Sequence, residues 1–114
     1  MIFNLFAKAD SNPRAGEIGF EELRQVIESD ASAIVDVREP HEFAGGHIAG
    51  AVNLPLSQFD PARLPKGRPL VIHCQSGMRS AAALSQTLKA GISDVRHYAG
   101  GMKDWRARGG AIVK

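Results

Sequence analysis

Val71-Ile72-His73-Cys74-Gln75-Ser76-Gly77-Met78-Arg79-Ser80 is the stretch that decides the fold of this 114-residue chain. An apolar run leads to Cys74, the only cysteine, and a polar turn around Gly77 then leads into an alanine-rich segment. A parallel strand followed by a helix would bring the sulfur to the carboxyl edge of a sheet, where open α/β folds keep their sites. Backbone N–H groups of the turn and the positive end of the helix would then stabilise a thiolate. Burial as a small hydrophobic residue is the alternative, and the positions of Gly77 and Arg79 argue against it.

The length and composition indicate one domain with its own hydrophobic core. A single cysteine cannot form an internal disulfide, which suits a reducing compartment, and no secretion signal is visible, so we expect a cytoplasmic protein. Residues 1–16 are interpreted as an N-terminal tail or linker, and residues 17–114 as the folded domain. The apolar opening of the tail is too short to span a bilayer, so we expect no membrane association.

The net charge of +2 hides an uneven distribution along the chain. Residues 1–60 hold 4 Lys or Arg and 10 Asp or Glu, a balance of −6, whereas residues 61–114 hold 10 and 2, a balance of +8. The cysteine loop lies in the basic half, so we expect its potential to favour small anions, although a charge split without function is an open alternative. The basic residues are scattered and few aromatic residues accompany them, which argues against nucleic-acid binding.

Apolar spacing and turn residues predict alternating strands and helices. Helices are predicted over residues 20–29 and 79–90, with short helices from Pro40 and after Gly100, and strands over 33–37, 51–54, 69–73 and 94–98. In the longest helix, Ala81, Leu84 and Leu88 are predicted to share a face, and Gly91 follows where a left-handed cap is favoured. This alternation predicts an α/β fold with a parallel sheet and helices on both faces.

Together, these segments resemble the rhodanese family of sulfurtransferases in its single-domain form, over about residues 17–112. The resemblance rests on spaced motifs that occur in one order: residues 34–40 with Glu42-Phe43, residues 46–55, residues 74–80, and Gly100-Gly101-Met102 with Trp105. Within the second motif, Ala49 stands where the family usually has proline. Any one motif would be a weak signal, and their shared order makes it strong.

The resemblance implies a five-stranded parallel sheet flanked by helices, and a catalytic cysteine at Cys74. In the family, this cysteine takes the outer sulfur of a donor such as thiosulfate, holds it as a persulfide, and passes it to an acceptor such as cyanide, a thiol or a protein. Two half-reactions through a covalent carrier predict ping-pong kinetics. This chemistry needs a thiolate and a cradle for a soft anion, so we expect neither a metal nor a cofactor.

The loop after Cys74 supplies the predicted substrate-binding residues. Arg79 either clamps an anionic donor with its planar guanidinium or braces the loop by binding carbonyl groups. Gln75 stands where many family members carry a basic residue, which leaves Arg79 as the only cation of the loop and weakens the expectation of strong thiosulfate binding. Met78 is expected to line the mouth of the pocket, with a plain surface position as the alternative.

Three small residues of the same loop are expected to hold the sulfur. The hydroxyl groups of Ser76 and Ser80 could donate to it, although Ser80 could instead cap the helix and Ser76 could simply fill the turn. Gly77 is expected to let the backbone curl with a positive φ, as in any tight turn.

A second group of polar residues is expected to support this loop. Asp36 and Arg38 follow another predicted strand at the same sheet edge and resemble the supporting pair of the family, with an exposed ion pair as the alternative. His73 should point to the opposite face from Cys74, so we reject it as a general base. His47 is expected to form a structural hydrogen bond in its turn. His41 and His97 are expected at the surface, with no metal-ligand spacing.

Two other functions compete with sulfur transfer by a free-standing enzyme. Cysteine phosphatases and arsenate reductases also carry a cysteine and an arginine in one loop, but phosphatases of that design place five residues between them, whereas four lie between Cys74 and Arg79. The second rival is a relay or binding module that carries a persulfide to a protein partner without rapid turnover. The same cysteine would serve both functions.

Overall fold

A computed structural model describes residues 16–114 of the chain. The predicted tail therefore lies outside the described residues except for Gly16, and its boundary stays a prediction. The elements in chain order are α2 (Phe20–Ser29), β1 (Ala33–Asp36), α3 (Pro40–Ala44), β2 (Val52–Asn53), the 3-10 turns η1 (Leu56–Gln58) and η2 (Pro61–Arg63), β3 (Leu70–His73), α4 (Met78–Lys89), β4 (Val95–Tyr98) and α5 (Gly101–Ala107). Each predicted helix and strand is present, with ends that differ by a few residues.

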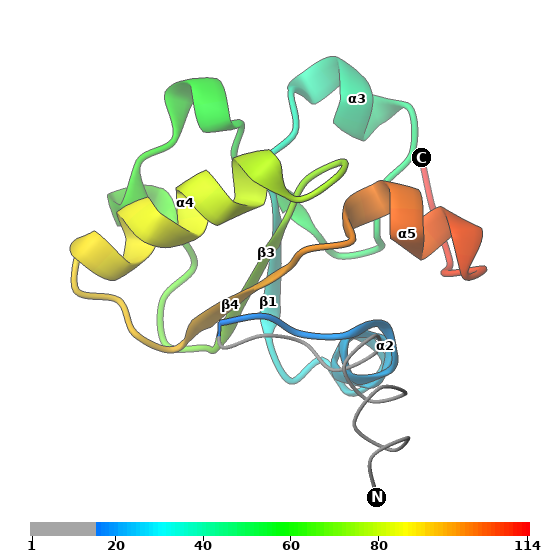
Figure 1. The fold of residues 1–114 in the computed structure, drawn as a ribbon, viewed down its shortest axis with the longest axis horizontal. Coiled ribbons are helices and arrows are strands. Elements are labelled where there is room, and N and C mark those ends of the chain that lie inside the picture. Colours follow the sequence, from blue (N-terminus) through cyan, green and yellow to red (C-terminus); the bar gives the residue numbers. More distant parts are fainter. Residues whose placement is uncertain (1–15) are drawn as a thin grey trace, which may run out of the picture.

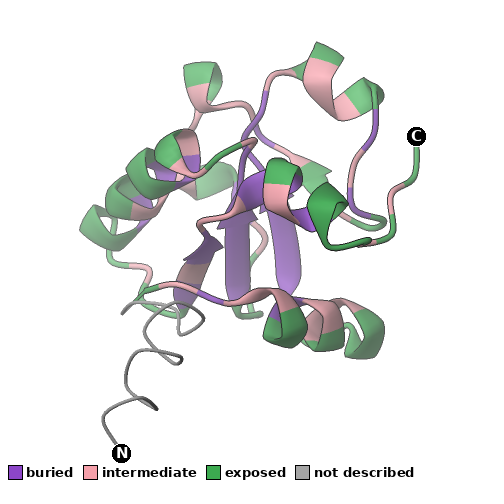
Figure 2. Ribbon diagram, turned by 45° about the vertical axis from the view of Figure 1, so that its right-hand side comes forward, coloured by how far each residue is buried: buried purple, intermediate pink, exposed green. Residues whose placement is uncertain are grey.

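The four strands form one parallel sheet in the order β2-β1-β3-β4, and helices cover both of its faces (Figure 1). Residues that alternate along β3 divide between the two faces, so Ile72 and Cys74 join one apolar cluster and Val71 joins the other. The first cluster lies under α4, and the second includes Leu23 of α2 and Trp105 of α5. Figure 2 shows the result, with β1 and β3 buried between helices whose outer faces are exposed, and β2 more exposed at the sheet edge.

The expected five-stranded sheet is wrong for residues 16–114, which contain four strands. Beyond β4, Glu17 forms a single parallel bridge with His97. The His97 N–H donates to Gly16 O at 2.9 Å, and the Ile18 N–H donates to His97 O at 3.1 Å. Because α2 begins at Phe20, the chain leaves the sheet edge after this one pair, and no strand of ordinary length forms there.

Of the three residues predicted to share a face of the longest helix, only Leu84 packs against the core. The buried residues of α4 are Ser80, Ala83 and Thr87, whereas Ala81 is exposed and Leu88 is 49% exposed. Small residues let the helix lie close to the sheet, and the hydroxyl groups on this face find partners within the protein. Thr87 Oγ1, for example, donates to Ala83 O at 2.8 Å. The expected left-handed residue after the helix is confirmed at Gly91, where φ is +89°.

A buried ion pair joins the end of β1 to the loop that follows it. Asp36 is 0% exposed and Arg38 is 2% exposed, so the exposed-pair alternative is wrong. Arg38 Nη2 donates to Asp36 Oδ2 at 2.8 Å and to Gly46 O at 2.8 Å. Asn53 Nδ2 donates to the carbonyl oxygens of Asp36 and Arg38, at 3.0 and 2.8 Å. The pair therefore fixes the path of the chain between β1 and β2.

Within residues 16–114, no helix has the length and apolar character that a membrane crossing requires.

Replacement of Arg38 by methionine should lower the free energy of unfolding by about 3–5 kcal/mol, because it leaves the Asp36 carboxylate buried without its cation. Urea denaturation measures the change. Arg24→Met is the matched control, since Arg24 also pairs with carboxylates but its side chain is 43% exposed, and it should change the stability little. Equal losses in the two variants would contradict a special role for the buried pair.

Candidate active site

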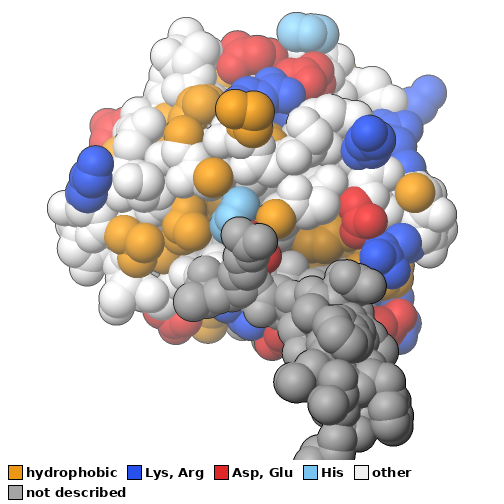
Figure 3. Space-filling model, in the orientation of Figure 1, with side chains coloured by type: hydrophobic (Ala, Val, Ile, Leu, Met, Phe, Trp, Pro, Cys, Tyr) orange, Lys and Arg blue, Asp and Glu red, His pale blue; other side chains and the backbone are white. Residues whose placement is uncertain are grey.

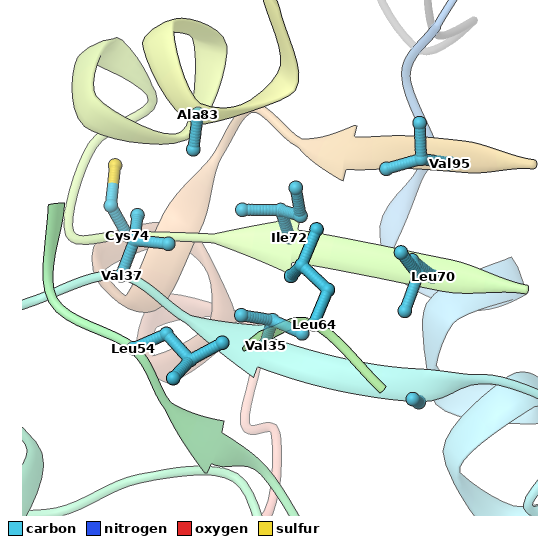
Figure 4. Packing of buried hydrophobic residues seen from close by; sticks show 10 residues of the cluster. Val35, Val37, Leu54, Leu64, Leu70, Ile72, Cys74, Ala83 and Val95 are labelled. Carbon is cyan, nitrogen blue, oxygen red and sulfur yellow. The ribbon is translucent and has the colours of Figure 1, made fainter. Parts of the chain in front are cut away.

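Cys74 follows β3 directly and lies at the carboxyl edge of the sheet, as predicted. Apolar side chains of the first cluster lie on one side of it, and Figure 4 shows the side chain pointing from the end of β3 toward α4, beside Val37. The residue is 1% exposed. The burial that the sequence left as an alternative is therefore present, although hydrogen-bond donors as well as apolar side chains contact Sγ.

Hydrogen-bond donors surround Sγ on the side of the loop. The N–H groups of Gly77 and Ser80 donate to Sγ at 3.1 and 3.3 Å, and Ser80 Oγ lies 3.6 Å from it. Burial raises the pKa of Cys74. Hydrogen bonds from the Ser80 side chain and from the backbone of Ser80, Gly77 and Ser76 together lower it by more, so the net pKa is below its ordinary value. The loop thus favours the thiolate, which is the nucleophilic form of cysteine.

The loop keeps this shape because the first turn of α5 holds it. The N–H groups of Met102 and Lys103 donate to the carbonyl oxygens of Cys74 and Gln75, at 2.9 and 3.0 Å. Helix N–H groups that lack partners within the helix are thereby satisfied. Gly101 makes the close approach possible, since a Cβ at this position would lie 2.5 Å from Gln75 O. Its φ of +66° also favours glycine.

Gly77 has the positive φ that the sequence predicts, with a value of +105°. A Cβ at this position would lie 2.4 Å from Ala99 O. The glycine therefore serves both the curl of the loop and its contact with the segment after β4.

Arg79 points to α3 and forms a two-pronged ion pair with Glu42. Its Nη1 and Nη2 atoms donate to Oε1 and Oε2 of Glu42 at 2.7 and 3.0 Å. The Glu42 side chain also accepts from the Glu39 N–H at 3.0 Å, in the capping box of α3. In Figure 3, acidic and basic side chains lie side by side over α3 and the start of α4. The charge split along the sequence therefore does not leave a free cation at Arg79.

The remaining loop residues lie nearer the surface. Gln75 is partly buried, Ser76 is exposed, and Met78 is 85% exposed. Ser80 is completely buried, and the N-cap of α4 is Gly77, so Ser80 is not the capping residue. Its hydroxyl group lies close to Sγ, as predicted.

The histidines divide into expected and unexpected cases. His73 is buried, and its ring nitrogens lie near Asp36 and the Cys74 carbonyl, on the side expected from its strand position. The ring of His47 bonds to Phe43 O at 2.8 Å, as expected of a structural residue. His41 is exposed, as predicted. The surface position predicted for His97 is wrong, because this residue is 7% exposed and its Nδ1 lies 2.8 Å from Ser80 Oγ.

Sequence reasoning missed the roles of Glu42, Asn53 and His97. Alternation along β4 could have located His97, because it lies two residues after Val95 and so shares the face that α4 covers. The pairing of Glu42 with Arg79 spans 37 positions, and no local pattern indicates it. Asn53 reaches the Asp36–Arg38 segment only because β2 pairs with β1.

Comparison with known proteins agrees with these features. Residues 20–108 match the family described as the rhodanese-like domain. An uncharacterized protein of Synechocystis sp. is 45% identical over 94 residues, which cover 81% of this chain and 52% of that protein. A sulfurtransferase of Allochromatium vinosum is 36% identical, with coverage of 85% and 94%. The human thiosulfate:glutathione sulfurtransferase is 33% identical, with coverage of 80% and 93%.

Among solved structures, a rhodanese-related protein from Thermoplasma volcanium superposes with a TM-score of 0.76 at 30% identity. The alignment covers 85% of this chain and 96% of that one. The chain spans about half of the length of the Synechocystis relative.

Replacement of Gly101 by alanine should displace the loop, because the new Cβ would collide with the Gln75 carbonyl. We expect a larger loss of unfolding free energy than in Gly91→Ala, measured by urea denaturation, together with a higher pKa of Cys74 in a thiolate titration. Gly91 is the matched control, since its φ is also positive but no atom lies within 4 Å of its added Cβ; that variant should cost about 1–2 kcal/mol. Equal losses and an unchanged titration would show that the contact with α5 does not shape the loop.

The ion pair between Glu42 and Arg79 should make stability depend on pH. The hydrogen bond from Arg79, opposed by burial, lowers the pKa of Glu42 from 4.5 to about 2. A carboxyl group whose pKa is lower in the folded state than in the unfolded state stabilises the fold. This contribution is fully present above pH 4.5 and is lost as the pH falls toward 2. Glu42→Gln should therefore lower the melting temperature at pH 7 and have little effect near pH 2.

The control for this experiment is Glu28→Gln, which removes an exposed partner of Arg24 and should change the melting temperature little at either pH. A Glu42→Gln effect of equal size at both pH values would rule out the ion pair as its source.

Proposed function

This chain belongs to the rhodanese family, and on that premise we propose that it is a sulfurtransferase whose Cys74 carries a sulfane sulfur as a persulfide. The observation that carries this proposal is the cradle of donors around Sγ, formed by the N–H groups of Gly77 and Ser80 and by the Ser80 hydroxyl group. The same donors suit each anionic sulfur species of the reaction, since they stabilise negative charge without having to reorganise.

The proposed reaction has two displacement steps. In the first, the Cys74 thiolate attacks the outer sulfur of the donor, an S–S bond forms, and the donor's own bond to that sulfur breaks; the leaving group, sulfite in the case of thiosulfate, departs with the electron pair. In the second, an acceptor nucleophile attacks the outer sulfur of the persulfide, and the Cys74 thiolate leaves. Sulfur moves as a neutral atom, so no external oxidant or reductant is consumed.

Thiosulfate or a related sulfane donor is the proposed first substrate, and a thiol, a protein or cyanide is the proposed acceptor. The name of the human thiosulfate:glutathione sulfurtransferase supports a thiol acceptor. Arg79 is held by Glu42, so the donor's charge must be met by backbone N–H groups unless this ion pair opens. The cycle requires a reduced Cys74, and we therefore expect the protein to act in the cytoplasm.

A persulfide relay is the second candidate function. Two observations favour it: Cys74 is 1% exposed, and the guanidinium group of Arg79 is paired rather than free for a small anion. A protein partner that opens the loop would solve both problems. Slow turnover with small acceptors, combined with full loading of Cys74, would distinguish the relay from a free-standing enzyme.

Incubation with thiosulfate, and separately with a polysulfide, should add one sulfur atom to the protein, as measured by intact mass. Reductant should remove it, and Cys74→Ser should gain none. Release of thiocyanate from cyanide then measures turnover. If neither donor loads Cys74, the sulfur-transfer proposal fails, and hydrolysis of an aryl phosphate that is lost in Cys74→Ser would instead support the phosphatase alternative.

A further inference from the structure

A line of buried polar groups leads from Cys74 to the far edge of the sheet. Sγ lies 3.6 Å from Ser80 Oγ, and Ser80 Oγ lies 2.8 Å from Nδ1 of His97. On the other side of the imidazole, Nε2 lies 3.8 Å from Glu17 Oε2. Cys74, Ser80 and His97 are 1%, 0% and 7% exposed. The loop after β3, α4, β4 and the segment before α2 thus bring a thiol, a hydroxyl group, an imidazole and a carboxylate into one row.

The hydroxyl group of Ser80 has one proton and several neighbours, so its direction depends on the charge of its partners. With a neutral thiol, the S–H group donates to Ser80 Oγ, and the hydroxyl group donates to Nδ1 of a neutral His97. With a thiolate, the hydroxyl group donates to Sγ, and a protonated Nδ1 of His97 donates to Ser80 Oγ. Both arrangements satisfy the same two distances, and they differ only in where the protons are.

We propose that His97 accepts the proton of Cys74 through Ser80 and so sets the thiolate content of the site. The step is balanced: the S–H bond breaks, the proton passes to Ser80 Oγ, and the hydroxyl proton of Ser80 passes to Nδ1. The products are a thiolate and an imidazolium ion. His97 is a positioning residue, since it acts through Ser80 and does not touch the sulfur. The use of this thiolate in catalysis rests on the proposed sulfur transfer.

The charged groups around the row support this direction of transfer. Glu17, from the segment before α2, faces His97 and favours the imidazolium form, whereas β3 places the neutral Ile72 beside it in the sheet. On α4, Ser80 is neutral, and the cation of Arg79 near the sulfur is paired with Glu42. Burial lowers the pKa of His97 and Glu17 raises it, with a net lowering. The ring is therefore neutral at neutral pH, and the imidazolium forms only where Glu17 and the new thiolate offset the cost of burying its charge.

The same geometry distinguishes His97 from the other buried histidine. His73 is adjacent to Cys74 in sequence, but its ring nitrogens lie near the Cys74 carbonyl oxygen and Asp36, on the other face of the sheet. Only the row through Ser80 reaches Sγ from a histidine within residues 16–114.

The test is the pH titration of the Cys74 thiolate by its ultraviolet absorbance. Cys74 is the only cysteine, and burial raises the pKa of Tyr98, the only tyrosine, so the signal near neutral pH belongs to one group. His97→Asn keeps a hydrogen-bonding group near Ser80 but cannot hold the proton. We expect it to raise the apparent pKa of Cys74 by about one unit, which is about a tenfold smaller thiolate fraction at a pH well below the pKa.

His41→Asn is the matched control, because His41 is exposed on α3, and it should leave the titration unchanged. Ser80→Ala should also raise the apparent pKa, and the double variant Ser80→Ala with His97→Asn should resemble Ser80→Ala alone, since residues that act through one another are not additive. A Cys74 titration that is the same in His97→Asn and in the unmodified protein would overturn the proposal, as would full additivity.

A reciprocal measurement covers the case in which His97→Asn does not fold. The pKa of His97, followed by NMR, should fall in Cys74→Ser, because the imidazolium loses its thiolate partner. An unchanged His97 pKa would overturn the proposal.

The two proposals fail in different ways. If Cys74 takes up sulfur but His97→Asn does not change the titration, the proposed proton transfer is ruled out and the proposed sulfurtransferase activity stands. A coupled titration without any sulfur loading would support the proton transfer and remove the proposed function.

Discussion

Two hydrogen bonds from the first turn of α5, to the carbonyl oxygens of Cys74 and Gln75, hold the loop on which the site depends. With these carbonyl groups held by α5, the loop curls through Gly77, and its N–H groups turn inward toward Sγ. The glycine at position 101 is a consequence of this contact, since any Cβ there would meet the loop backbone. The motif after β4 thus has a mechanical role in the chemistry of a residue that precedes it by 27 positions.

The charged residues of the site serve mainly to fix structure. Arg38 is buried against Asp36 and the loop carbonyl of Gly46, and Arg79 is bound to Glu42 in α3. Each arginine joins segments that are separate in sequence. The sulfur itself is stabilised by neutral donors, namely backbone N–H groups and a hydroxyl group. Such donors suit a site where the charged sulfur species changes during the reaction, because they neither neutralise it permanently nor need to leave.

Much of the fold could be predicted because strong local patterns specify it. The apolar run of β3, the turn at Gly77 and the glycine after α4 identify a strand, a curl and a helix end without reference to the rest of the chain. The inner face of α4 could not be predicted in this way. Its buried positions hold Ser80 and Thr87. The Ser80 hydroxyl group finds partners in the cysteine loop and in β4, whereas the Thr87 hydroxyl group donates to Ala83 O within the helix.

By itself, the sequence determined the order of strands and helices, the family, and the placement of Cys74 and its loop at a sheet edge, since each depends on residues that are neighbours in the chain. Tertiary structure alone decided that the edge beyond β4 has one bridge instead of a fifth strand, that Glu42 forms an ion pair with Arg79, and that the His97 ring contacts the Ser80 hydroxyl group. The physical reason is common to all three. These contacts join residues far apart in sequence, and their partners are selected by the packing of helices on the sheet, which no local pattern records.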